Sequence, residues 1–493
     1  MNNDTNRDAS WREELRSALS AKQRTSIPRA VIPQLDAKFR IHSNHEVNQG
    51  LSQAQAVLEA TRCLDCPDPQ CITGCPVSIN IPGFIKNIER GEILEAAKVL
   101  KQTSALPAVC GRVCPQEKQC ESRCIYNKMK KQPVAIGYLE RFAADFEREN
   151  NKANNIQPKP SAVEKNGFNI AVVGSGPAGL SFAGDMIKKG YNVTVYEALH
   201  EIGGVLKYGI PEFRLPNAVV EAEIDGLRAE GVNFVKDCVI GKTISYEQLH
   251  ELGYSGIFVA SGAGLPRFMG IPGENFIGIM SSNEYLTRIN LMGAGRPGED
   301  TPVLKGHRVA VIGGGNTAMD SVRTALRQGS EKAMIVYRRS LDEMPARVEE
   351  VHHAQEEGVE FMTLCNPVEY LADEKGRVRA MRVQRMELGE PDASGRRSPV
   401  PVEGAIEEIE VDLVIVSVGV SPNPLIPNSI PELEISRRGT IVVNESTMQS
   451  SLSDIYAGGD IVRGGATVIL AMGDGRRAAA AMDAELMKQE KGK

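Results

Sequence analysis

The stretch NIAVVGSGPAGLSFAGDMIKKGYNVTVYE, residues 169–197, predicts the fold of the larger part of this 493-residue chain. A short apolar run, a glycine-rich turn, a helix-forming segment and a second apolar run follow one another in it. The same order returns in HRVAVIGGGNTAMDSVRTALRQGSEKAMIVYRR, residues 307–339. Two such units predict two dinucleotide-binding domains, each built on a largely parallel sheet.

The glycine turn of the first unit is suited to a bound pyrophosphate. Its early glycines permit a tight turn and close backbone approach, and Gly179 lets the helix pack on the strand. Glu197 ends the next strand, where its carboxylate can accept hydrogen bonds from ribose hydroxyls. An ordinary turn is the alternative, but strand, helix and terminal acid are all in place, and Gly203-Gly204 follows as a further flavoprotein feature. The turn consists of Gly174, Ser175, Gly176, Pro177, Ala178 and Gly179.

The second unit ends in a different kind of residue. Where an NAD site would place an acid on the 2′-hydroxyl, this chain has Arg338 and Arg339. A guanidinium suits a 2′-phosphate through charge and paired hydrogen bonds, so the pattern favours NADPH over NADH. Arg347 could add to the same patch, and a solvated basic turn is the alternative. The turn residues here are Gly314, Gly315, Asn316 and Thr317.

Eight of the ten cysteines form two sets of four in the first quarter of the chain. They are Cys63-x2-Cys66-x4-Cys71-x3-Cys75-Pro76 and Cys110-x3-Cys114-x5-Cys120-x3-Cys124. Soft thiolates at such short intervals are what an iron–sulfur cluster needs. Zinc would more often show paired C-x2-C units or histidine partners, and none of the seven histidines lies inside either set. Cys238 and Cys365 stand alone and are expected to be buried as small apolar residues.

Composition excludes several classes of protein. The net charge of −6 argues against a nucleic-acid binder, and no apolar run approaches the roughly 20 residues of a membrane-spanning helix. The first residues lack a secretory signal, so disulfides are disfavoured and the cytoplasm is the expected compartment. Basic residues near the second cysteine set could form a solvated face, offset cluster charge or bind an acidic partner. They are Arg112, Lys118, Arg123, Lys128, Lys130 and Lys131.

The N-terminal region is predicted to form a small helical domain. Residues 1 to about 50 are polar and predict helix together with an extended arm. A helix is expected over Ile81–Lys101, with Ile93, Leu94, Ala97 and Leu100 on its apolar face. Further helices are expected at residues 51–62 and Val134–Glu149, and residues 150–166 are expected to be a linker.

The order of the strands predicts that the second nucleotide domain is inserted in the first. Apolar runs at Gly256–Ser261 and Val411–Val418, the latter followed by Gly419, mark the passages into the second domain and back. The segment Asp454–Asp460 and the helix after it then complete the first domain. The predicted fold class is α/β, with a helical iron–sulfur domain followed by two Rossmann-like domains. The predicted boundaries are 1–165 for the helical domain, 166–290 and 416–493 for the flavin domain, and 291–415 for the nicotinamide domain.

Six segments together resemble the small (beta) subunit of NADPH-dependent glutamate synthase. Its relatives include the N-terminal half of dihydropyrimidine dehydrogenase and the large subunit of the bifurcating NADH-dependent ferredoxin:NADP oxidoreductase. The resemblance covers nearly the whole chain from about residue 40. The segments are Cys63–Pro76, CGRVCPQEKQCESRC at 110–124, GSGPAG at 174–179, GGVLKYGIPEFRLP at 203–216, GGGNTAMD at 313–320 and AGGDIVRGGATV at 457–468.

The resemblance implies FAD, NADPH and two [4Fe–4S] clusters as cofactors. It assigns Cys63, Cys66, Cys71 and Cys124 to one cluster, and Cys75, Cys110, Cys114 and Cys120 to the other. It implies that Arg214 and Asp460 contact FAD and that Gly314–Thr317, Arg338 and Arg339 hold NADPH. Gly204, Gly419, Gly459 and Thr467 complete the predicted cofactor-binding residues.

The implied function is electron input. The chain would oxidise NADPH at FAD and pass electrons singly through the clusters to a large glutamate synthase subunit with FMN and a glutamine amidotransferase domain. That subunit would make glutamate from glutamine and 2-oxoglutarate, since this chain has no N-terminal cysteine nucleophile and no third nucleotide domain. No catalytic side chain is expected, because hydride transfer between nicotinamide and flavin needs none. The alternatives are the large subunit of an NADH-dependent ferredoxin:NADP oxidoreductase or sulfide dehydrogenase, another redox acceptor protein as partner, or a non-enzymatic scaffold.

Overall fold

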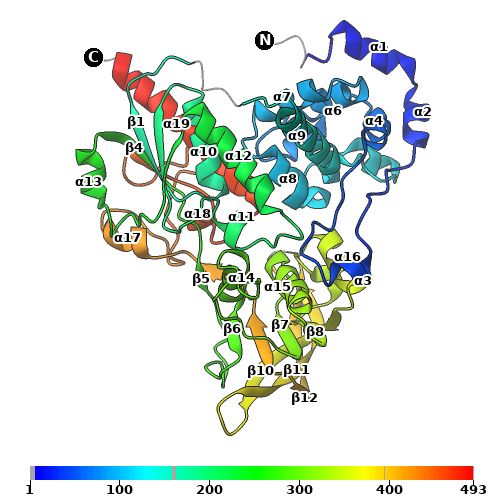
Figure 1. Ribbon diagram of the computed structural model, residues 1–493, viewed down its shortest axis with the longest axis vertical. Helices are drawn as coiled ribbons and strands as arrows, with labels where there is room; N and C mark the ends of the chain where they lie inside the picture. Colours follow the sequence, from blue (N-terminus) through cyan, green and yellow to red (C-terminus); the bar gives the residue numbers. More distant parts are fainter. Residues whose placement is uncertain (1–5, 158–162, 394, 492–493) are drawn as a thin grey trace.

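The computed structural model describes residues 6–157, 163–393 and 395–491, and it has three parts (Figure 1). A helical region lies beside a five-stranded sheet, and a second five-stranded sheet lies below both in that view. This is the predicted fold class. Residues 158–162 of the expected linker lie outside the described residues. No helix in the described ranges is both long and apolar enough to cross a membrane.

The helical region follows the prediction except at its centre. The helix expected over Ile81–Lys101 is two helices, because Gly91 adopts φ +85° between them. Of the four residues expected on the apolar face, Ile93, Ala97 and Leu100 are buried, and Leu94 is 37% exposed. The helices are α1 (Ser10–Ala18), α2 (Ala21–Ser26), α3 (Ala37–Arg40), α4 (Gln53–Thr61), α5 (Gln70–Thr73), α6 (Ile81–Glu89), α7 (Ile93–Lys101), α8 (Pro107–Val113) and α9 (Ile136–Ala153), with short 3₁₀ turns η2 (Gln116–Lys118), η3 (Glu121–Arg123) and η4 (Ile125–Met129).

The first sheet is parallel, with the strand order β15-β4-β1-β2-β3. Its strands are β1 (Asn169–Val173), β2 (Asn192–Tyr196), β3 (Asn233–Val235), β4 (Tyr254–Val259) and β15 (Ile455–Ala457). Helices α10 (Pro177–Ile187), α12 (Asn217–Glu230) and α19 (Val468–Lys491) cover one face, and α13 (Tyr246–Glu251) and α17 (Leu425–Ser429) cover the other. Strand β15 arrives after an insertion of nearly 200 residues, as predicted for a split domain.

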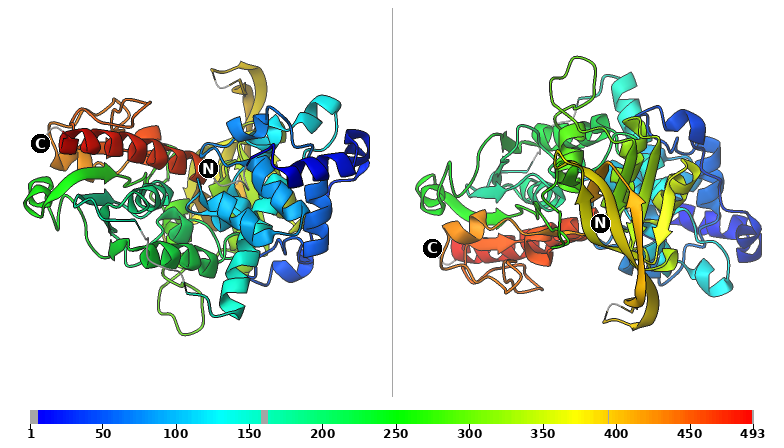
Figure 2. Two further views of the ribbon diagram at one scale, coloured as in Figure 1. Left: turned by 90° about the horizontal axis from the view of Figure 1, so that it is seen from above. Right: turned by 90° about the horizontal axis from the view of Figure 1, so that it is seen from below.

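The second sheet is also parallel, with the strand order β6-β13-β7-β8-β9. Its strands are β6 (Ile279–Ser281), β7 (Arg308–Ile312), β8 (Lys332–Tyr337), β9 (Glu360–Thr363) and β13 (Leu413–Val416), and its helices are α14 (Ser282–Asn290), α15 (Asn316–Arg327) and α16 (Val348–Glu356). A three-stranded antiparallel sheet of β10 (Cys365–Ala372), β11 (Val378–Pro391) and β12 (Arg397–Glu410) covers the other face. The β11–β12 hairpin extends away from the body of the molecule (Figure 2).

The passage into the second sheet comes earlier than the predicted boundary at residue 290. Strand β6 pairs with β13, and α14 packs beside α15, so residues from about 279 onward belong with the second sheet. Strand β5 (Leu265–Pro266) pairs with β14 (Val420–Ser421) to form a two-stranded link where the chain crosses between the sheets. The difference arises because a strand as short as β6 carries little sequence signal.

One hydrophobic core runs through the helical region and the first sheet. It contains Phe84 of α6 and Leu139 of α9 together with Phe182 of α10 and Met472 of α19. A shared core fixes the orientation of two elements much more firmly than a polar interface would. The helical region and the first sheet therefore form one rigid unit.

Candidate functional site

One set of four thiols lies toward the surface of the helical region: Cys63, Cys66, Cys71 and Cys124, called here the outer set. Burial raises the pKa of Cys71, and the neighbouring thiols Cys63, Cys124 and Cys66 raise it further. Burial also raises the pKa of Cys63 to about 11. These four side chains therefore interact with one another, although Cys124 is more than 50 residues from the others in sequence.

The remaining four thiols, Cys75, Cys110, Cys114 and Cys120, form the inner set. A hydrogen bond with Cys114, burial and the nearby Cys75 all raise the pKa of Cys110. Burial raises the pKa of Cys75 to about 12, with a smaller contribution from Cys114. The thiols of each set therefore lie near one another, and the binding of one cluster by each set stays a prediction.

The chemistry of both sets fits an iron–sulfur cluster. Four buried or partly buried thiols that disfavour one another's ionised forms need a strong positive charge before they can all become thiolates. Among the described residues, no three His, Cys, Asp or Glu side chains are arranged to hold one metal ion. A four-iron cluster does not need such a group, because each thiolate binds a different iron atom.

The sequence did not single out two charged residues beside the outer set. Lys86 is fully buried in α6, and its Nζ donates to the Cys63 carbonyl oxygen at 2.6 Å and to Glu89 at 2.5 Å. Asp65 is buried at φ +52° and pairs with Arg12 and, at 2.8 Å, with Arg16 of α1. The one available signal was a lysine in the apolar run IPGFIKNIE.

The inner set contacts the first turns of α19, just beyond the flavin-domain segment that the sequence singled out at residues 457–468. The Cys110 Sγ lies 3.4 Å from the Met472 Sδ in α19. Beside Cys120, the Gln119 Nε2 donates to the Thr467 Oγ1 at 3.4 Å. A side chain at Gly473 would meet the Pro76 carbonyl oxygen at 2.9 Å, so the two backbones approach closely. The inner set is therefore the one that adjoins the first sheet.

The first glycine turn has the geometry that its sequence predicts. Gly174 adopts φ +103°, and an added Cβ would lie 2.5 Å from the Ala260 carbonyl oxygen. An added Cβ at Gly179 would collide with the Gly174 carbonyl oxygen. Gly176 precedes α10, which has no side-chain cap, and a Cβ there would meet nothing within 4 Å. Open space at an uncapped helix N-terminus is suited to a pyrophosphate.

Glu197 follows β2 as predicted and stabilises the turn. Its Oε2 accepts from the Ser175 backbone N–H at 3.0 Å and from the Ser175 hydroxyl, and its Oε1 accepts from the Leu199 N–H at 2.9 Å. The Ser175 hydroxyl in turn accepts from the Gly203 N–H at 2.9 Å, next to Gly204 at φ +55°. Ribose binding by Glu197 stays a prediction.

The first residue of α18 (Asp460–Arg463) presents a partly buried carboxyl beside the first sheet. Burial raises the pKa of Asp460 to about 6. Gly459 adopts φ +78°, and its N–H donates to the Asp474 Oδ2 at 3.0 Å. Asp474, which the sequence reading missed, is fully buried and pairs with Arg463 at 2.6 Å. The contact of Asp460 with FAD stays a prediction.

Two other predicted flavin-domain residues lie where the sheets meet. The Arg214 Nη1 donates to the Asp320 Oδ2 of α15 at 2.6 Å, and its Nε lies 3.7 Å from Glu350. This guanidinium therefore points toward the second domain, and its predicted contact with FAD is not tested. Gly419 adopts φ +107° after β13, and its carbonyl accepts from the Arg267 N–H at 3.0 Å.

The second glycine turn is equally close-packed. A Cβ at Gly314 would meet the Tyr337 ring at 2.8 Å, whereas one at Gly315, just before α15, would meet nothing within 4 Å. The Asn316 Oδ1 accepts from the Arg347 N–H at 2.8 Å, and the Thr317 carbonyl accepts from the Ser321 hydroxyl.

The three predicted arginines do not form one patch. The Arg339 guanidinium is buried and donates to the Arg397 carbonyl at 2.8 Å and to Asp392 at 2.6 Å. Arg347 is buried and donates to the Arg112 carbonyl at 2.6 Å and to Gln116 at 2.8 Å, both in the helical region. Arg338 alone is exposed, and within the described ranges its side chain has no hydrogen-bond or ion-pair partner. The sequence could not show which of the three arginines is free to bind a phosphate, because the residues that pair with Arg339 and Arg347 come from distant segments of the chain.

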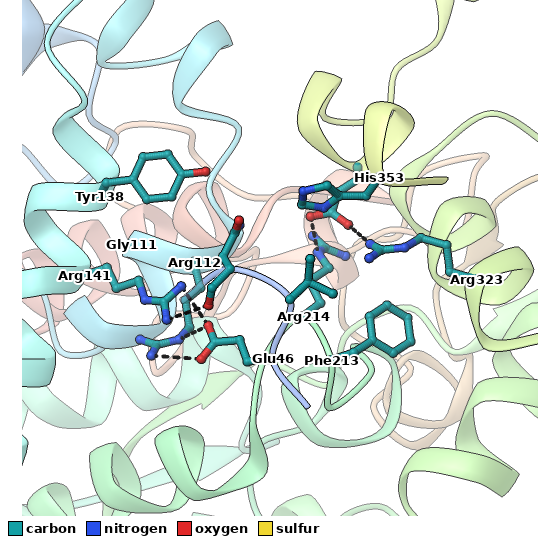
Figure 3. A pocket seen from close by; sticks show the side chains of 12 residues that line it. Glu46, Gly111, Arg112, Tyr138, Arg141, Phe213, Arg214, Arg323 and His353 are labelled. Carbon is teal, nitrogen blue, oxygen red and sulfur yellow. Dashed lines mark hydrogen bonds and ion pairs between the residues drawn. The ribbon is translucent and has the colours of Figure 1, made fainter. Parts of the chain in front are cut away.

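The helical region, the first sheet and the second sheet meet at a small polar cavity (Figure 3). On one side, Glu46 lies between Arg112 at 2.8 Å and Arg141 at 3.0 Å. Arg323 and His353 lie on the other side, with Arg214 between the two groups. This junction belongs to the framework that places the second sheet.

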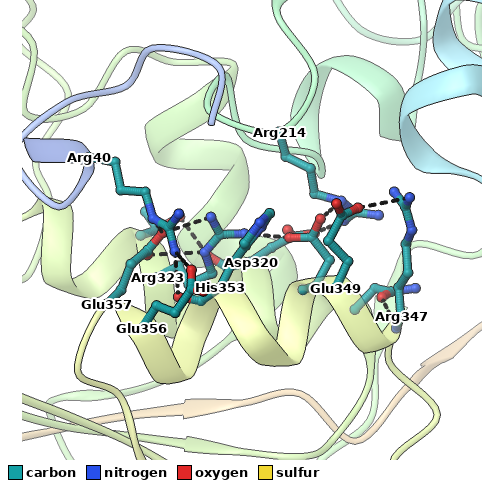
Figure 4. A network of polar contacts seen from close by, with 12 residues as sticks. Arg40, Arg214, Asp320, Arg323, Arg347, Glu349, His353, Glu356 and Glu357 are labelled. Atoms are coloured by element: carbon teal, nitrogen blue, oxygen red, sulfur yellow. Dashed lines mark hydrogen bonds and ion pairs between the residues drawn. The ribbon is translucent and has the colours of Figure 1, made fainter. Parts of the chain in front are cut away.

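Helix α16 carries the polar network that completes the junction (Figure 4). Glu357, after the end of α16, pairs with Arg323 and with Arg40 of the N-terminal arm at 2.8 and 2.9 Å. Glu350 pairs with Arg323, and the Tyr138 hydroxyl of α9 donates to Glu349. The second sheet is thereby tied to the arm, to the helical region and, through Arg214, to the first sheet.

We expect this network to make the protein acid-sensitive. Burial raises the pKa of Glu350, but Arg323 and Arg214 outweigh burial and lower it to about 2. Its contribution to stability is complete above the unfolded pKa near 4.5 and is lost as the pH falls toward 2, on the order of 3 kcal/mol. Glu350→Gln should lower the melting temperature at pH 7 and flatten its decline between pH 5 and 3. An unchanged acid slope in thermal scans would contradict this assignment.

Comparison with known families agrees with both halves of the structure. Residues 40–152 match the family described as dihydropyrimidine dehydrogenase domain II, 4Fe–4S cluster. Residues 168–475 match the pyridine nucleotide-disulphide oxidoreductases. Among solved structures, FprA from Mycobacterium tuberculosis in complex with NADPH aligns with a TM-score of 0.56 and 21% identity, over 66% of this chain and 86% of that one. That likeness concerns the fold alone.

Curated relatives, two of them of similar length to this chain, show to which family it belongs. The glutamate synthase [NADPH] small chain of Azospirillum brasilense is 37% identical, over 88% of this chain and 90% of the relative. The Escherichia coli small chain is 36% identical, over 91% and 95%. The beta subunit of NADP(+)-dependent formate dehydrogenase from Moorella thermoacetica is 37% identical, over 84% of this chain and 59% of the relative. The chain therefore belongs to the glutamate synthase small-chain family of oxidoreductases, with an iron–sulfur domain preceding a pyridine nucleotide-disulphide oxidoreductase domain.

Proposed function

We propose that the chain is the electron-input subunit of a glutamate synthase. It binds FAD at the turn of residues 174–179, NADPH at the turn of residues 313–317, and one [4Fe–4S] cluster at each thiol set. It delivers electrons to a large subunit that makes glutamate from glutamine and 2-oxoglutarate. The observation that carries this proposal is the contact between the inner set and α19, at Cys110 and Met472.

The residues of the chain bind and orient, and none needs to act as an acid or nucleophile. Bound FAD accepts a hydride from NADPH and gives up electrons one at a time, which is the chemistry of the cofactor itself. Gly176 and Gly315 leave open space before α10 and α15, where the backbone N–H groups can bind pyrophosphate. The shared core of the helical region and first sheet keeps water out of the space between them.

The positions of the two thiol sets relative to the first sheet indicate the order of the two clusters along the electron path. The inner set adjoins the first sheet through Met472 and Gln119, and the outer set lies beyond it beside exposed residues of η4. With the cofactors bound, the inner set would hold the cluster nearer the flavin domain and the outer set the cluster farther from it. The outer set is then the exit toward a partner.

The decisive experiment is co-production with a glutamate synthase large chain from the same source. The purified complex should oxidise NADPH only when glutamine and 2-oxoglutarate are both present, with one glutamate-forming turnover for each NADPH. Oxidation of NADPH by a pure complex that forms no glutamate would overturn the assignment.

A second candidate is electron input to another acceptor. The formate dehydrogenase beta subunit matches this chain at the same 37% identity as the small chain from Azospirillum. The NADPH–Fe(3+) oxidoreductase beta subunit of Geobacter sulfurreducens matches at 35% over 96% of this chain. Reduction of ferredoxin or ferric iron by the purified protein, without any glutamate formation, would favour this candidate.

We expect Arg338 to determine the preference for NADPH. Arg338→Ala should raise the dissociation constant for NADPH roughly 10- to 100-fold, because a charge-assisted hydrogen bond contributes about 1.5–3 kcal/mol. The constant for NADH should change little, as NADH has no 2′-phosphate. Arg339→Ala is the matched control: it should lower stability by removing the contact with Asp392 and leave the ratio of the two constants unchanged. Equal weakening of both nucleotides by Arg338→Ala would contradict the assignment.

A further inference from the structure

The surface next to the outer thiol set carries positive charge that the protein does not neutralise. The segment from Arg123 to Lys131, which contains η4, exposes four cations, and Met129 among them is 39% exposed. None of the four makes an ion pair with a described residue, although the chain as a whole has a net charge of −6. We call this surface the basic rim; its residues are Arg123, Lys128, Met129, Lys130 and Lys131.

Several other exposed cations of the chain are paired with acids. On the β11–β12 hairpin, Arg385 pairs with Glu407 at 2.7 Å, Arg379 with Glu408 at 3.2 Å, and Arg382 with Glu369 at 2.9 Å. Such pairs leave little net field above the surface. The basic rim differs from that hairpin, because none of its four cations pairs with an acid of the described residues; the Lys131 Nζ donates to the Thr25 carbonyl oxygen at 2.5 Å.

The rim is held in a fixed shape. Tyr126 is buried, its hydroxyl donates to the Arg62 carbonyl at 2.6 Å, and the Arg62 guanidinium lies over its ring. The Asn127 Nδ2 donates to the Glu121 carbonyl at 2.7 Å, and the Lys130 N–H donates to the Asn127 carbonyl at 3.0 Å. A rigid surface with an exposed apolar centre and a charged margin has the composition of a protein interface.

We propose that the basic rim is the docking surface for the electron-accepting partner and that the partner presents an acidic face to it. This inference rests on the proposed function. The residues of the rim lie on both sides of Cys124 in the sequence, so a protein bound there lies next to the outer set. Unpaired lysines around a fixed apolar centre attract an acidic surface and orient it during encounter. The rim thus predicts where the partner binds and that its binding face is acidic.

The test compares two double variants with the same change in net charge. Lys128→Glu with Lys130→Glu reverses the rim, and Lys242→Glu with Lys375→Glu reverses two exposed lysines of the first sheet's domain and the antiparallel sheet. Each holoprotein is mixed with the glutamate synthase large chain of the same source, and the association rate is measured as salt increases. We expect the rim variant to associate at least about tenfold more slowly at low salt. This deficit should vanish near 1 M salt, where the Debye length is about 3 Å.

Small charged oxidants separate this inference from the proposed function. Each NADPH-reduced holoprotein is mixed with ferricyanide, an anion, and with hexaammineruthenium(III), a cation. Rim reversal should slow cluster oxidation by ferricyanide and speed it by the ruthenium complex, with dye reduction by NADPH unchanged. If neither the unchanged protein nor any variant forms glutamate but the oxidant rates still depend on charge, the glutamate assignment is wrong and the rim proposal is retained.

Three results would overturn the docking surface. The first is equal loss of association in both double variants, which would make net charge the cause. The second is unchanged association and unchanged oxidant rates in the rim variant. The third is a change in the oligomeric state of the free chain on rim reversal, which would make a second copy of this chain the occupant.

Discussion

Cys110→Ser should interrupt the electron path at the inner set while leaving the flavin active. A serine oxygen is a poor ligand for iron, and Cys110 is buried against Met472. We expect iron and acid-labile sulfide to fall to half, and glutamate formation with the large chain to fall to background. NADPH-driven reduction of a dye that accepts electrons from the flavin should continue.

A matched control and a companion variant make this result specific. Cys238→Ser removes a buried thiol that belongs to neither set and should leave iron content unchanged. Cys71→Ser should remove the outer cluster alone, and NADPH should still reduce the inner one, as seen by electron paramagnetic resonance. If Cys71→Ser prevented reduction of the remaining cluster, the inferred order of the two sets would be reversed. Full iron content in Cys110→Ser would contradict the division into sets.

Gly176→Ala should weaken FAD binding without weakening the fold. Gly176 has φ −69°, which alanine adopts freely, and an added methyl group meets nothing within 4 Å in the chain itself. The same methyl group would occupy the space before α10 where a pyrophosphate approaches the backbone. We expect the dissociation constant for FAD to rise at least about tenfold, or about 1.4 kcal/mol, with an unchanged melting temperature of the flavin-free chain.

Two other glycines provide the comparison. Gly226→Ala, within α12, also meets nothing within 4 Å and should change neither FAD affinity nor, beyond a small gain, stability. Gly179→Ala would collide with the Gly174 carbonyl and should lower stability as well as FAD affinity. Normal FAD affinity in Gly176→Ala would place the pyrophosphate elsewhere.

Local patterns in the sequence predicted the elements well where periodicity and turn residues agree. Both strand–turn–helix–strand units lie where the sequence placed them, because a glycine turn between apolar runs specifies its own conformation. The single helix expected over Ile81–Lys101 was wrong, since Gly91 ends one helix and a second begins at Ile93. The boundary near residue 290 shifted for a related reason: β6 has three residues and belongs to its sheet only through pairing with β13.

The arginines show the limit of a local motif. The run Arg338-Arg339 and the nearby Arg347 look equivalent as charges. In the fold, Asp392 from the β11–β12 hairpin engages Arg339, and Gln116 from the helical region engages Arg347. Of these three arginines, Arg338 is the one whose side chain has no partner among the described residues. Local sequence cannot reveal this, because the partners are more than 50 and more than 200 residues away.

The sequence by itself determined the chemistry: two sets of four thiols, two glycine turns and an acid or an arginine pair after each second strand. These are short-range features, because each motif spans fewer than about 30 consecutive residues. The tertiary structure alone decided that the inner set adjoins α19, that Arg214 reaches Asp320 and that the basic rim pairs with no acid in the part of the chain that the structure describes. Those outcomes depend on contacts between distant segments, and such contacts form only when burial of a shared core brings the segments together.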